Sequence, residues 1–206
     1  MIEQGTPEWF AQRIGRVTAS RVADIMAKTK TGVSASRGNY LAQLVAERLT
    51  GQSADTFKSG AMQHGTETEP QARMAYEAET GQIVGEVAMI THPTIEMSGA
   101  SPDGLVGEDG LVEIKCPNTS THIATLLADK APSGYMGQMQ WQMACTGRAW
   151  CDFVSFDPRM PNDMQLFVKR VPRDDALIAE YEAEVIKFLA EVQETVDKLI
   201  ALRRGV

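Results

Sequence analysis

The stretch SPDGLVGEDGLVEIKCP (residues 101–117) predicts a β-hairpin whose turn is Gly-Glu-Asp-Gly at 107–110. Side chains alternate between the two faces of a strand, so Glu113 and Lys115 point to one face and the apolar residues beside them point to the other. The turn brings Asp103 opposite or nearly opposite Glu113, where paired Cα atoms lie about 4.5–5.5 Å apart. The hairpin therefore gathers charged side chains where apolar ones would pack against a core.

Two carboxylates this close repel, and one of them takes up a proton unless a positive charge lies between them. A divalent cation removes the conflict, and ligands that offer only oxygen favour Mg²⁺ or Mn²⁺ over zinc. The histidines show no metal-ligand spacing, and we expect surface or structural roles for them: His64, His92 and His122. A metal-bound water near the ammonium of Lys115, on the same face as Glu113, can be oriented and deprotonated for attack on phosphorus. Asp103, Glu113 and Lys115 thus predict phosphodiester hydrolysis, and the alternative is a surface salt bridge between Glu113 and Lys115 or their neighbours.

Length and composition indicate one α/β domain spanning residues 1–206, since 43% of the residues are hydrophobic and 23% are charged. There is no basic and then apolar N-terminal segment, and no apolar run approaches the roughly 18 residues of a membrane span. The cysteines are three in number and form no C-x-x-C pair. These features favour a reducing, cytoplasmic setting, with no membrane partner.

The charge is unevenly distributed along the chain. The net charge is −7, yet residues 1–60 hold eight Lys and Arg against five Asp and Glu, and residues 61–206 hold twelve against twenty-two. A basic N-terminal part on an acidic protein permits one local anion-binding surface. Ordinary scatter of surface charge explains the same counts equally well.

Helix and strand signals alternate along the chain. Thr6 and Pro7 start a helix over 6–15, and Thr18 is the expected cap of a second helix over 18–28. A Gly- and Ser-rich loop is expected at 29–39. Further helices are predicted at about 40–50, 67–80, 120–128 and 135–146, strands within 82–117 and at 150–157 and 164–171, and a long helix from about 174 to 203. This order predicts a sheet flanked by helices.

The hairpin SPDG…LVEIKCP resembles the PD-(D/E)-x-K nuclease superfamily and, within it, the lambda-exonuclease group of phage recombination nucleases. Other blocks resemble the same group in the same order: EWFAQRIGRVTAS (8–20), HGTETEPQAR (64–73), YMGQMQW (135–141) and FDPRM (156–160). The resemblance implies an α/β fold with a restriction-endonuclease-like core, in which helices flank a central mixed β-sheet, and a long helix at the C-terminus.

The resemblance also implies roles for individual residues. Asp103 and Glu113 match the metal-binding carboxylates, the Ile114 carbonyl matches a backbone ligand, and Lys115 matches the residue that positions the nucleophile. The implied cofactor is Mg²⁺, with Mn²⁺ as a possibility and two ions per site.

Two further residues match the catalytic pattern of the group. Glu69 matches an upstream acidic residue that helps to hold the metals or their water, and a charge at a helix start is the alternative. Gln138 matches an active-site glutamine, whereas pattern alone favours a solvent contact.

By the same resemblance, the enzyme degrades one strand of double-stranded DNA from its 5′ end and leaves a 3′ single strand for recombination. Recognition of a 5′-phosphate falls to Arg13, Ser20 and Ser101, whose guanidinium fork and hydroxyl groups suit that task. A capping role is the alternative for Ser20.

Contacts near the duplex junction are implied for Trp9 and Met62, with core packing as the alternative for both, and Lys30 could contact the approaching strand. Implied partners are DNA ends, two further copies of the chain in a homotrimeric ring, and a phage single-strand annealing protein, in the cytoplasm of a bacterial host. Two other functions stay open: a related endonuclease, and a non-catalytic module that binds DNA ends.

Overall fold

The computed structural model describes residues 2–29, 32–54 and 60–204. Lys30 and the side chain of Met62 lie outside the described residues. In this part of the chain, no helix is both long enough and apolar enough to cross a membrane.

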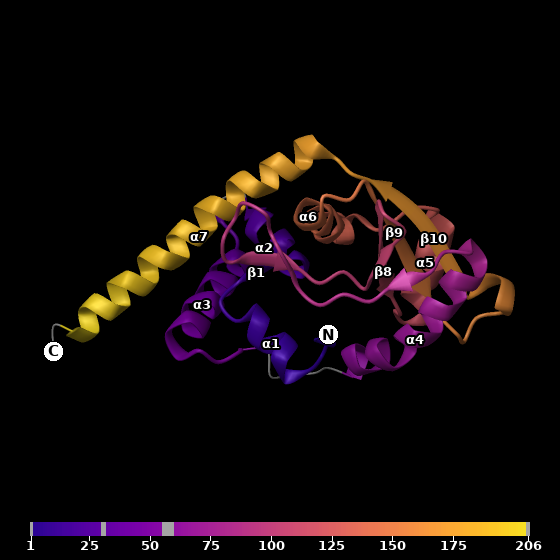
Figure 1. Cartoon of the computed structure of the whole chain (residues 1–206), viewed down its shortest axis with the longest axis horizontal. Helices are drawn as coiled ribbons and strands as arrows, with labels where there is room; N and C mark the ends of the chain where they lie inside the picture. Colours follow the sequence, from indigo (N-terminus) through magenta and orange to yellow (C-terminus); the bar gives the residue numbers. More distant parts are fainter. Residues whose placement is uncertain (1, 30–31, 55–59, 205–206) are drawn as a thin grey trace.

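Helices and strands alternate much as the sequence predicts (Figure 1). The helices are α1 (Pro7–Arg13), η1 (Ala19–Arg21), α2 (Val22–Met26), α3 (Ala35–Thr50), α4 (Gly60–Thr80), α5 (Thr119–Ala128), η2 (Ser133–Tyr135), α6 (Met136–Thr146), η3 (Asn162–Met164) and α7 (Asp175–Arg204). The strands are β1 (Val17–Thr18), β2 (Lys28–Thr29), β3 (Gly32–Val33), β4 (Val84–Gly85), β5 (Ile90–Thr91), β6 (Ser98–Ala100), β7 (Gly104–Val106), β8 (Gly110–Lys115), β9 (Trp150–Phe156) and β10 (Leu166–Pro172).

A five-stranded sheet in the order β10-β9-β8-β7-β4 forms the centre of the fold. β8 and β9 run parallel and the other neighbours run antiparallel, which confirms the predicted mixed sheet. On one face Tyr76 of α4 packs in a cluster with Val112 and Val154. On the other face Met139 of α6 packs with Phe153. Because α4 and α6 cover opposite faces, a polar side chain on β8 is enclosed by one helix or the other.

The register of the hairpin between β7 and β8 confirms the pairing expected from the sequence. Gly104 pairs with Val112, which puts Asp103 and Glu113 one step beyond the last paired residues. Val106 pairs with Gly110, so Gly110 already belongs to β8 and the predicted turn at 107–110 is one residue too long. Gly110 is also a point of close approach, since a Cβ there would lie 2.1 Å from carbons of the Trp150 ring.

The sequence suggested one meander of strands over residues 82–117, and this prediction is wrong. β5 and β6 leave the main sheet and join β1 in a separate sheet of order β1-β6-β5, with Val17 opposite Ser98 in a parallel pair. This pairing brings the N-terminal segment against the residues that follow β6. It therefore places α1 beside Ser101, far away in the sequence.

Two local predictions are wrong. Residues 29–39 are not one loop: β2 and β3 pair, and α3 starts at Ala35 because the Ser34 side chain accepts a hydrogen bond from the Arg37 N–H (3.2 Å). Thr18 is extended and makes no side-chain cap; its N–H donates to the Tyr40 hydroxyl (3.2 Å) instead.

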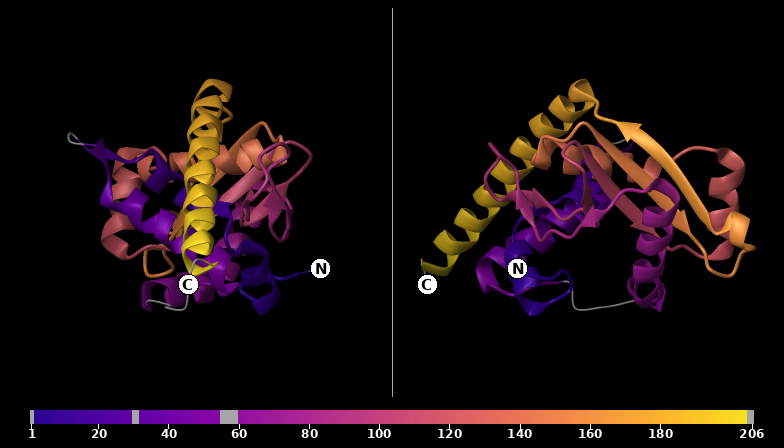
Figure 2. Two further views of the ribbon diagram at one scale, coloured as in Figure 1. Left: turned by 90° about the vertical axis from the view of Figure 1, so that its left-hand side faces the viewer. Right: turned by 45° about the vertical axis from the view of Figure 1, so that its right-hand side comes forward.

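The predicted long C-terminal helix is confirmed as α7. Figure 2 shows β10 leading into α7 at the top of the molecule, from where the helix descends to the C-terminus. Phe188 of α7 stacks on Tyr40 of α3, with ring centroids 5.5 Å apart, and Arg37 binds both carboxylate oxygens of Glu191 at 2.7 Å. These contacts attach α7 to α3.

Candidate active site

Glu113 is fully buried on the face of β8 that α6 covers. The amide of Gln138 donates a hydrogen bond to Glu113 Oε1 at 2.5 Å, and the amide of Gln142 donates to Oε2 at 2.5 Å. The ammonium of Lys115 forms an ion pair with Oε1. Both oxygens of this carboxylate are therefore held in place, and Gln138 is a partner of a predicted catalytic group rather than a simple solvent contact.

Asp103 immediately precedes β7 and faces the end of β8, where its Oδ2 accepts a hydrogen bond from the N–H of Ile114 at 2.6 Å. Burial raises the pKa of Asp103 well above its usual range, and the charge of Glu113 raises it further. Burial alone would lower the pKa of Lys115, but the charges of Glu113 and Asp103 outweigh burial and raise it. The lysine thus stays charged between two acidic groups. These contacts do not fit the alternative of a surface salt bridge, because the Glu113 side chain is fully buried.

Glu69 lies within α4 rather than at its start, since α4 begins at Gly60, and the alternative of a helix-start charge is wrong. Its carboxylate accepts from Arg73 at 3.3 Å, and the same guanidinium donates to the carbonyl of Asp103 at 3.2 Å. Burial raises the pKa of Glu69; Arg73 lowers it, and the charge of Glu113 raises it again. Glu69 is therefore electrostatically linked to the hairpin.

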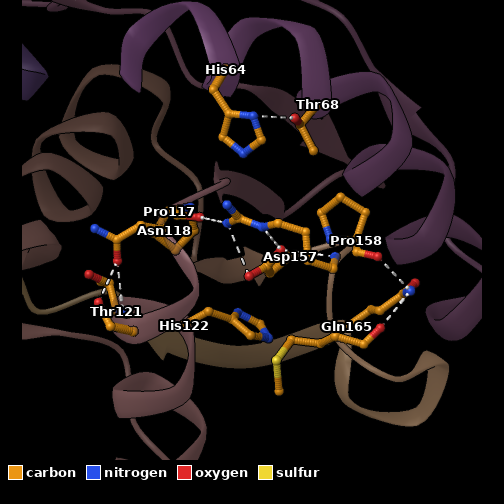
Figure 3. Close-up of polar contacts among 12 residues, drawn as sticks. His64, Thr68, Pro117, Asn118, Thr121, His122, Asp157, Pro158 and Gln165 are labelled. Carbon is orange, nitrogen blue, oxygen red and sulfur yellow. Dashed lines mark hydrogen bonds and ion pairs between the residues drawn. The ribbon is translucent and has the colours of Figure 1, made fainter. Parts of the chain in front are cut away.

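The predicted catalytic residues of α4 and the hairpin line one open cleft of about 510 Å³: Glu69, Asp103, Ile114 and Lys115. His64, Asn118 and Arg159 line the same cleft. Figure 3 shows polar residues of this region, with His64 extending from α4 toward the segment that carries Asp157 and Pro158.

The donor chemistry of this cleft fits a hard divalent cation. Asp103, Glu113 and the end of β8 at Ile114 offer oxygen only, as Mg²⁺ prefers. Within the described residues, no group of three or more His, Cys, Asp and Glu side chains is arranged so that it could hold a metal ion by itself. Burial, with the charges of Glu69 and Asp103, raises the pKa of the nearby Cys116 thiol to about 12. A neutral thiol does not compete as a soft ligand.

A second polar group lies where α1 meets the end of β6. Ser101 Oγ accepts from Trp9 Nε1 at 3.1 Å and from Arg13 Nη1 at 3.4 Å. The Arg13 guanidinium lies 4.2 Å from the centroid of the Trp9 ring. Because α1 contributes no buried residue, the alternative of core packing for Trp9 is wrong. The structure thus brings Arg13 and Ser101 together, as predicted.

Ser20 is exposed and lies in the middle of η1, whose N-cap is Thr18. The capping alternative for Ser20 is therefore wrong. Ser20 lies on a different element from the group of Trp9, Arg13 and Ser101.

Sequence reasoning missed Gln142, the second amide that holds Glu113. Gln142 is fully buried and lies one helical turn after Gln138 on α6. The spacing of four residues in MGQMQWQ was the available signal, because residues i and i+4 share a helix face. Arg73, which joins Glu69 to the hairpin, was also missed.

The model of the YqaJ-like viral recombinase domain family matches residues 8–149. The chain belongs to this family. No curated protein sequence matches the chain. Among solved structures, the alkaline exonuclease LHK-Exo from Laribacter hongkongensis is 57% identical, with a TM-score of 0.91, and the match covers 97% of this chain and 99% of that chain.

The same exonuclease in complex with dAMP matches with a TM-score of 0.92 at 57% identity, again over 97% of this chain and 99% of that one. A phage-related exonuclease from Haemophilus somnus 129PT is 19% identical, with a TM-score of 0.67 over 91% of this chain and 96% of that chain, and this likeness shows the fold alone. The resemblance to the lambda-exonuclease group and the fold class that it implied are therefore confirmed.

Proposed function

We propose that the protein is a metal-dependent nuclease of recombination that degrades one strand of double-stranded DNA in the 5′→3′ direction and leaves 3′ single-stranded overhangs. The observation that carries this proposal is that Asp103 and Lys115 line one cleft, with the ammonium of Lys115 paired to the buried carboxylate of Glu113. The 57% identical relative is described as an alkaline exonuclease, which supports the same activity here.

Each residue of the cluster has a proposed task. When bound, Mg²⁺ offsets the charge that develops on the phosphoryl oxygens. Asp103, Glu113 and the Ile114 carbonyl would hold the metal, with two ions per site, and Glu69 of α4 would help to hold the metals or their water. Lys115 orients the attacking water through its ammonium group, and Gln138 fixes the carboxylate of Glu113. A charged lysine suits this task because its hydrogens are directed donors and its charge offsets the nearby carboxylates.

The group at α1 is proposed to bind the 5′-phosphate of the DNA end. Arg13 offers a planar fork of donors and Ser101 a hydroxyl, and both are already joined by a hydrogen bond. The Trp9 ring makes a cation–π contact with the Arg13 guanidinium and is proposed to offer an apolar surface near the duplex junction. Ser20 stays a predicted 5′-phosphate ligand, and Lys30 and Met62 stay predicted DNA contacts.

A homotrimeric ring is proposed because an acidic protein must follow DNA over many cleavage steps. A ring with residues 1–60 facing its channel would place the basic part of the chain beside the duplex and keep the acidic part outside. Light scattering coupled to size exclusion, without DNA, is expected to give a trimer mass at micromolar concentration; a monomer mass would contradict the ring. The proposed further partner is a single-strand annealing protein, in the cytoplasm of a bacterial host.

The experiment that tests the function compares a linear duplex with a covalently closed circle of the same sequence in Mg²⁺. An exonuclease consumes the linear form and leaves the circle intact. A related endonuclease would also cut the circle, and a non-catalytic end-binding module would cut neither.

A further inference from the structure

Arg159 lies in the turn after β9, at the cleft that holds Asp103 and Lys115. Its Nε donates to Asp157 Oδ1 at 2.6 Å, and its Nη2 donates to Asp157 Oδ2 at 3.1 Å and to the carbonyl of Pro117 at 3.0 Å. The Asp157 side chain is fully buried, whereas the Arg159 side chain is 49% exposed. The buried carboxylate of Asp157 thus fixes the orientation of the half-exposed guanidinium of Arg159.

The remaining edge of this guanidinium is available to a ligand. Within the described part of the chain, no hydrogen bond from Arg159 uses Nη1. Burial alone would raise the pKa of Asp157, but hydrogen bonds from Arg159 and Thr119 lower it to about 2, so the ion pair is complete at neutral pH. A planar guanidinium with a fixed orientation and free N–H groups suits the oxygens of a phosphate.

Arg170 shows what the same pairing looks like away from the cleft. Its Nε and Nη2 bind the two oxygens of Asp152, a buried carboxylate of β9, both at 2.9 Å. The guanidinium then lies 3.4 Å from the centroid of the Trp150 ring, and Arg170 does not line the cleft. Arg170 thus pairs with a buried aspartate and stacks on an aromatic ring, away from the cleft. Arg159 makes the same kind of pair but lines the cleft.

We propose that Arg159 binds a backbone phosphate next to the scissile one, on the DNA strand that enters the cleft, and that Asp157 is its positioning residue. This inference rests on the proposed function, because it is the hydrolysis at Asp103 and Lys115 that fixes where the strand runs. A strand with its scissile phosphate at those residues continues along the same cleft, where its next phosphates meet Arg159. The contact carries no sequence information, since it reads only the backbone.

The test uses Arg159→Gln with Arg170→Gln as the matched control. Affinity for a 5′-phosphorylated linear duplex is measured by fluorescence anisotropy in EDTA, which prevents metal-dependent cleavage, over a series of KCl concentrations. Log affinity falls as log salt rises, and each lost phosphate contact makes this negative slope shallower by about 0.7–0.9. We expect Arg159→Gln to lose one such contact and Arg170→Gln to keep the wild-type slope.

Steady-state kinetics with Mg²⁺ give a second readout. Arg159→Gln is expected to raise KM several-fold with kcat near the wild-type value, because the lost contact does not touch the reacting atoms. Arg159→Lys keeps the charge and the pairing with Asp157 but lacks the fork, so we expect a wild-type salt slope with a raised KM. If a thermal melt shows that Arg159→Gln is not folded, the KM of Arg159→Lys tests the phosphate contact instead.

Two results would overturn the inference: a wild-type salt slope in Arg159→Gln, or a wild-type KM in Arg159→Lys. Either of them, together with normal hydrolysis by the unmodified protein, removes the role of Arg159 alone. The absence of Mg²⁺-dependent hydrolysis in the unmodified protein removes the proposed function instead, whatever the salt slopes are.

Discussion

The side-chain amide of Gln142 donates a hydrogen bond to Glu113 Oε2 over 2.5 Å, and both side chains are fully buried. Gln138, one turn earlier on α6, holds the other oxygen at 2.5 Å. Burial removes a carboxylate from water, which costs free energy that its hydrogen bonds in the folded protein offset. If one of these hydrogen bonds is removed, the cost of burial remains. The two amides therefore fix one orientation of Glu113, and α6 acts as a support for the hairpin.

Replacing Gln142 by methionine, which has a similar volume, should lower the free energy of unfolding by about 1.5–3 kcal/mol, the range for a hydrogen bond to a charged group. It should also lower nuclease activity, because Glu113 is no longer held. Gln140→Met is the matched control: Gln140 is equally buried on α6 but binds the Pro172 carbonyl and the Asp174 N–H. Urea unfolding and initial rates measure both effects. A Gln142→Met protein with the wild-type rate, or a control with the same loss of rate, would contradict this role.

The hairpin residues should each be essential for turnover. Asp103→Ala, Glu113→Ala and Lys115→Ala are each expected to lower kcat by at least about 10²-fold, the usual scale for groups that act on transition-state charge or proton transfer. Lys169→Ala is the control, since that lysine pairs with exposed Asp129 at 3.0 Å. Release of acid-soluble nucleotides measures the rates. Substantial Mg²⁺-dependent hydrolysis by Lys115→Ala would remove its assigned task.

The raised pKa of Asp103 predicts how the metal-free protein responds to pH. Because burial raises this pKa above the value of about 3.9 in the unfolded chain, the folded protein binds the proton more tightly. Ionising Asp103 therefore destabilises the fold, and this loss grows as the pH rises above about 4. Asp103→Asn stays neutral and can still accept from the N–H of Ile114.

The asparagine variant should be more stable than the wild type in EDTA at pH 8, and the difference should shrink as the pH falls toward 4. Urea unfolding at several pH values measures it. A variant that is less stable than the wild type by the same amount at every pH would show that ionisation of Asp103 does not destabilise the fold, and would contradict the raised pKa.

Recognition of the DNA end should depend on Arg13. Arg13→Ala is expected to slow digestion of a 5′-phosphorylated duplex by the equivalent of about 1.5–3 kcal/mol, the range for a hydrogen bond to a charged group, and to slow a 5′-hydroxyl duplex far less. Single-turnover rates on the two substrates give the ratio. Equal slowing of both would make Arg13 a structural residue that only orders Ser101.

The sequence predicted the hairpin well because its information is local. Turn chemistry and the period of two were enough to place Asp103 beside Glu113, and the structure has the same register. Sequence reasoning could not place β6 in a second sheet, since that depends on Val17 pairing with Ser98 far along the chain. It also ended the loop too late, because the Ser34 cap of α3 was not recognised.

The site was predictable where a family pattern covered it and not where partners come from distant elements. Glu113 was predicted as a ligand, but its second amide partner was not. The spacing of four residues puts Gln142 on the same helix face as Gln138, yet it does not show that this face packs against β8. Arg159 stood within a matching block, yet its contact with Pro117 depends on how the turn after β9 meets the end of the hairpin. Such contacts follow from packing between elements, which sequence periodicity does not encode.

The polarity of digestion tests the central claim most directly. A linear duplex with 5′-phosphates on both ends is labelled on one strand either at the 5′ end or at the 3′ end, and release of label is followed in Mg²⁺ and in EDTA. We expect early release of the 5′ label, retention of the 3′ label on a long single strand, and no release in EDTA. Early release of the 3′ label, or equal release in EDTA, would contradict a metal-dependent 5′→3′ exonuclease.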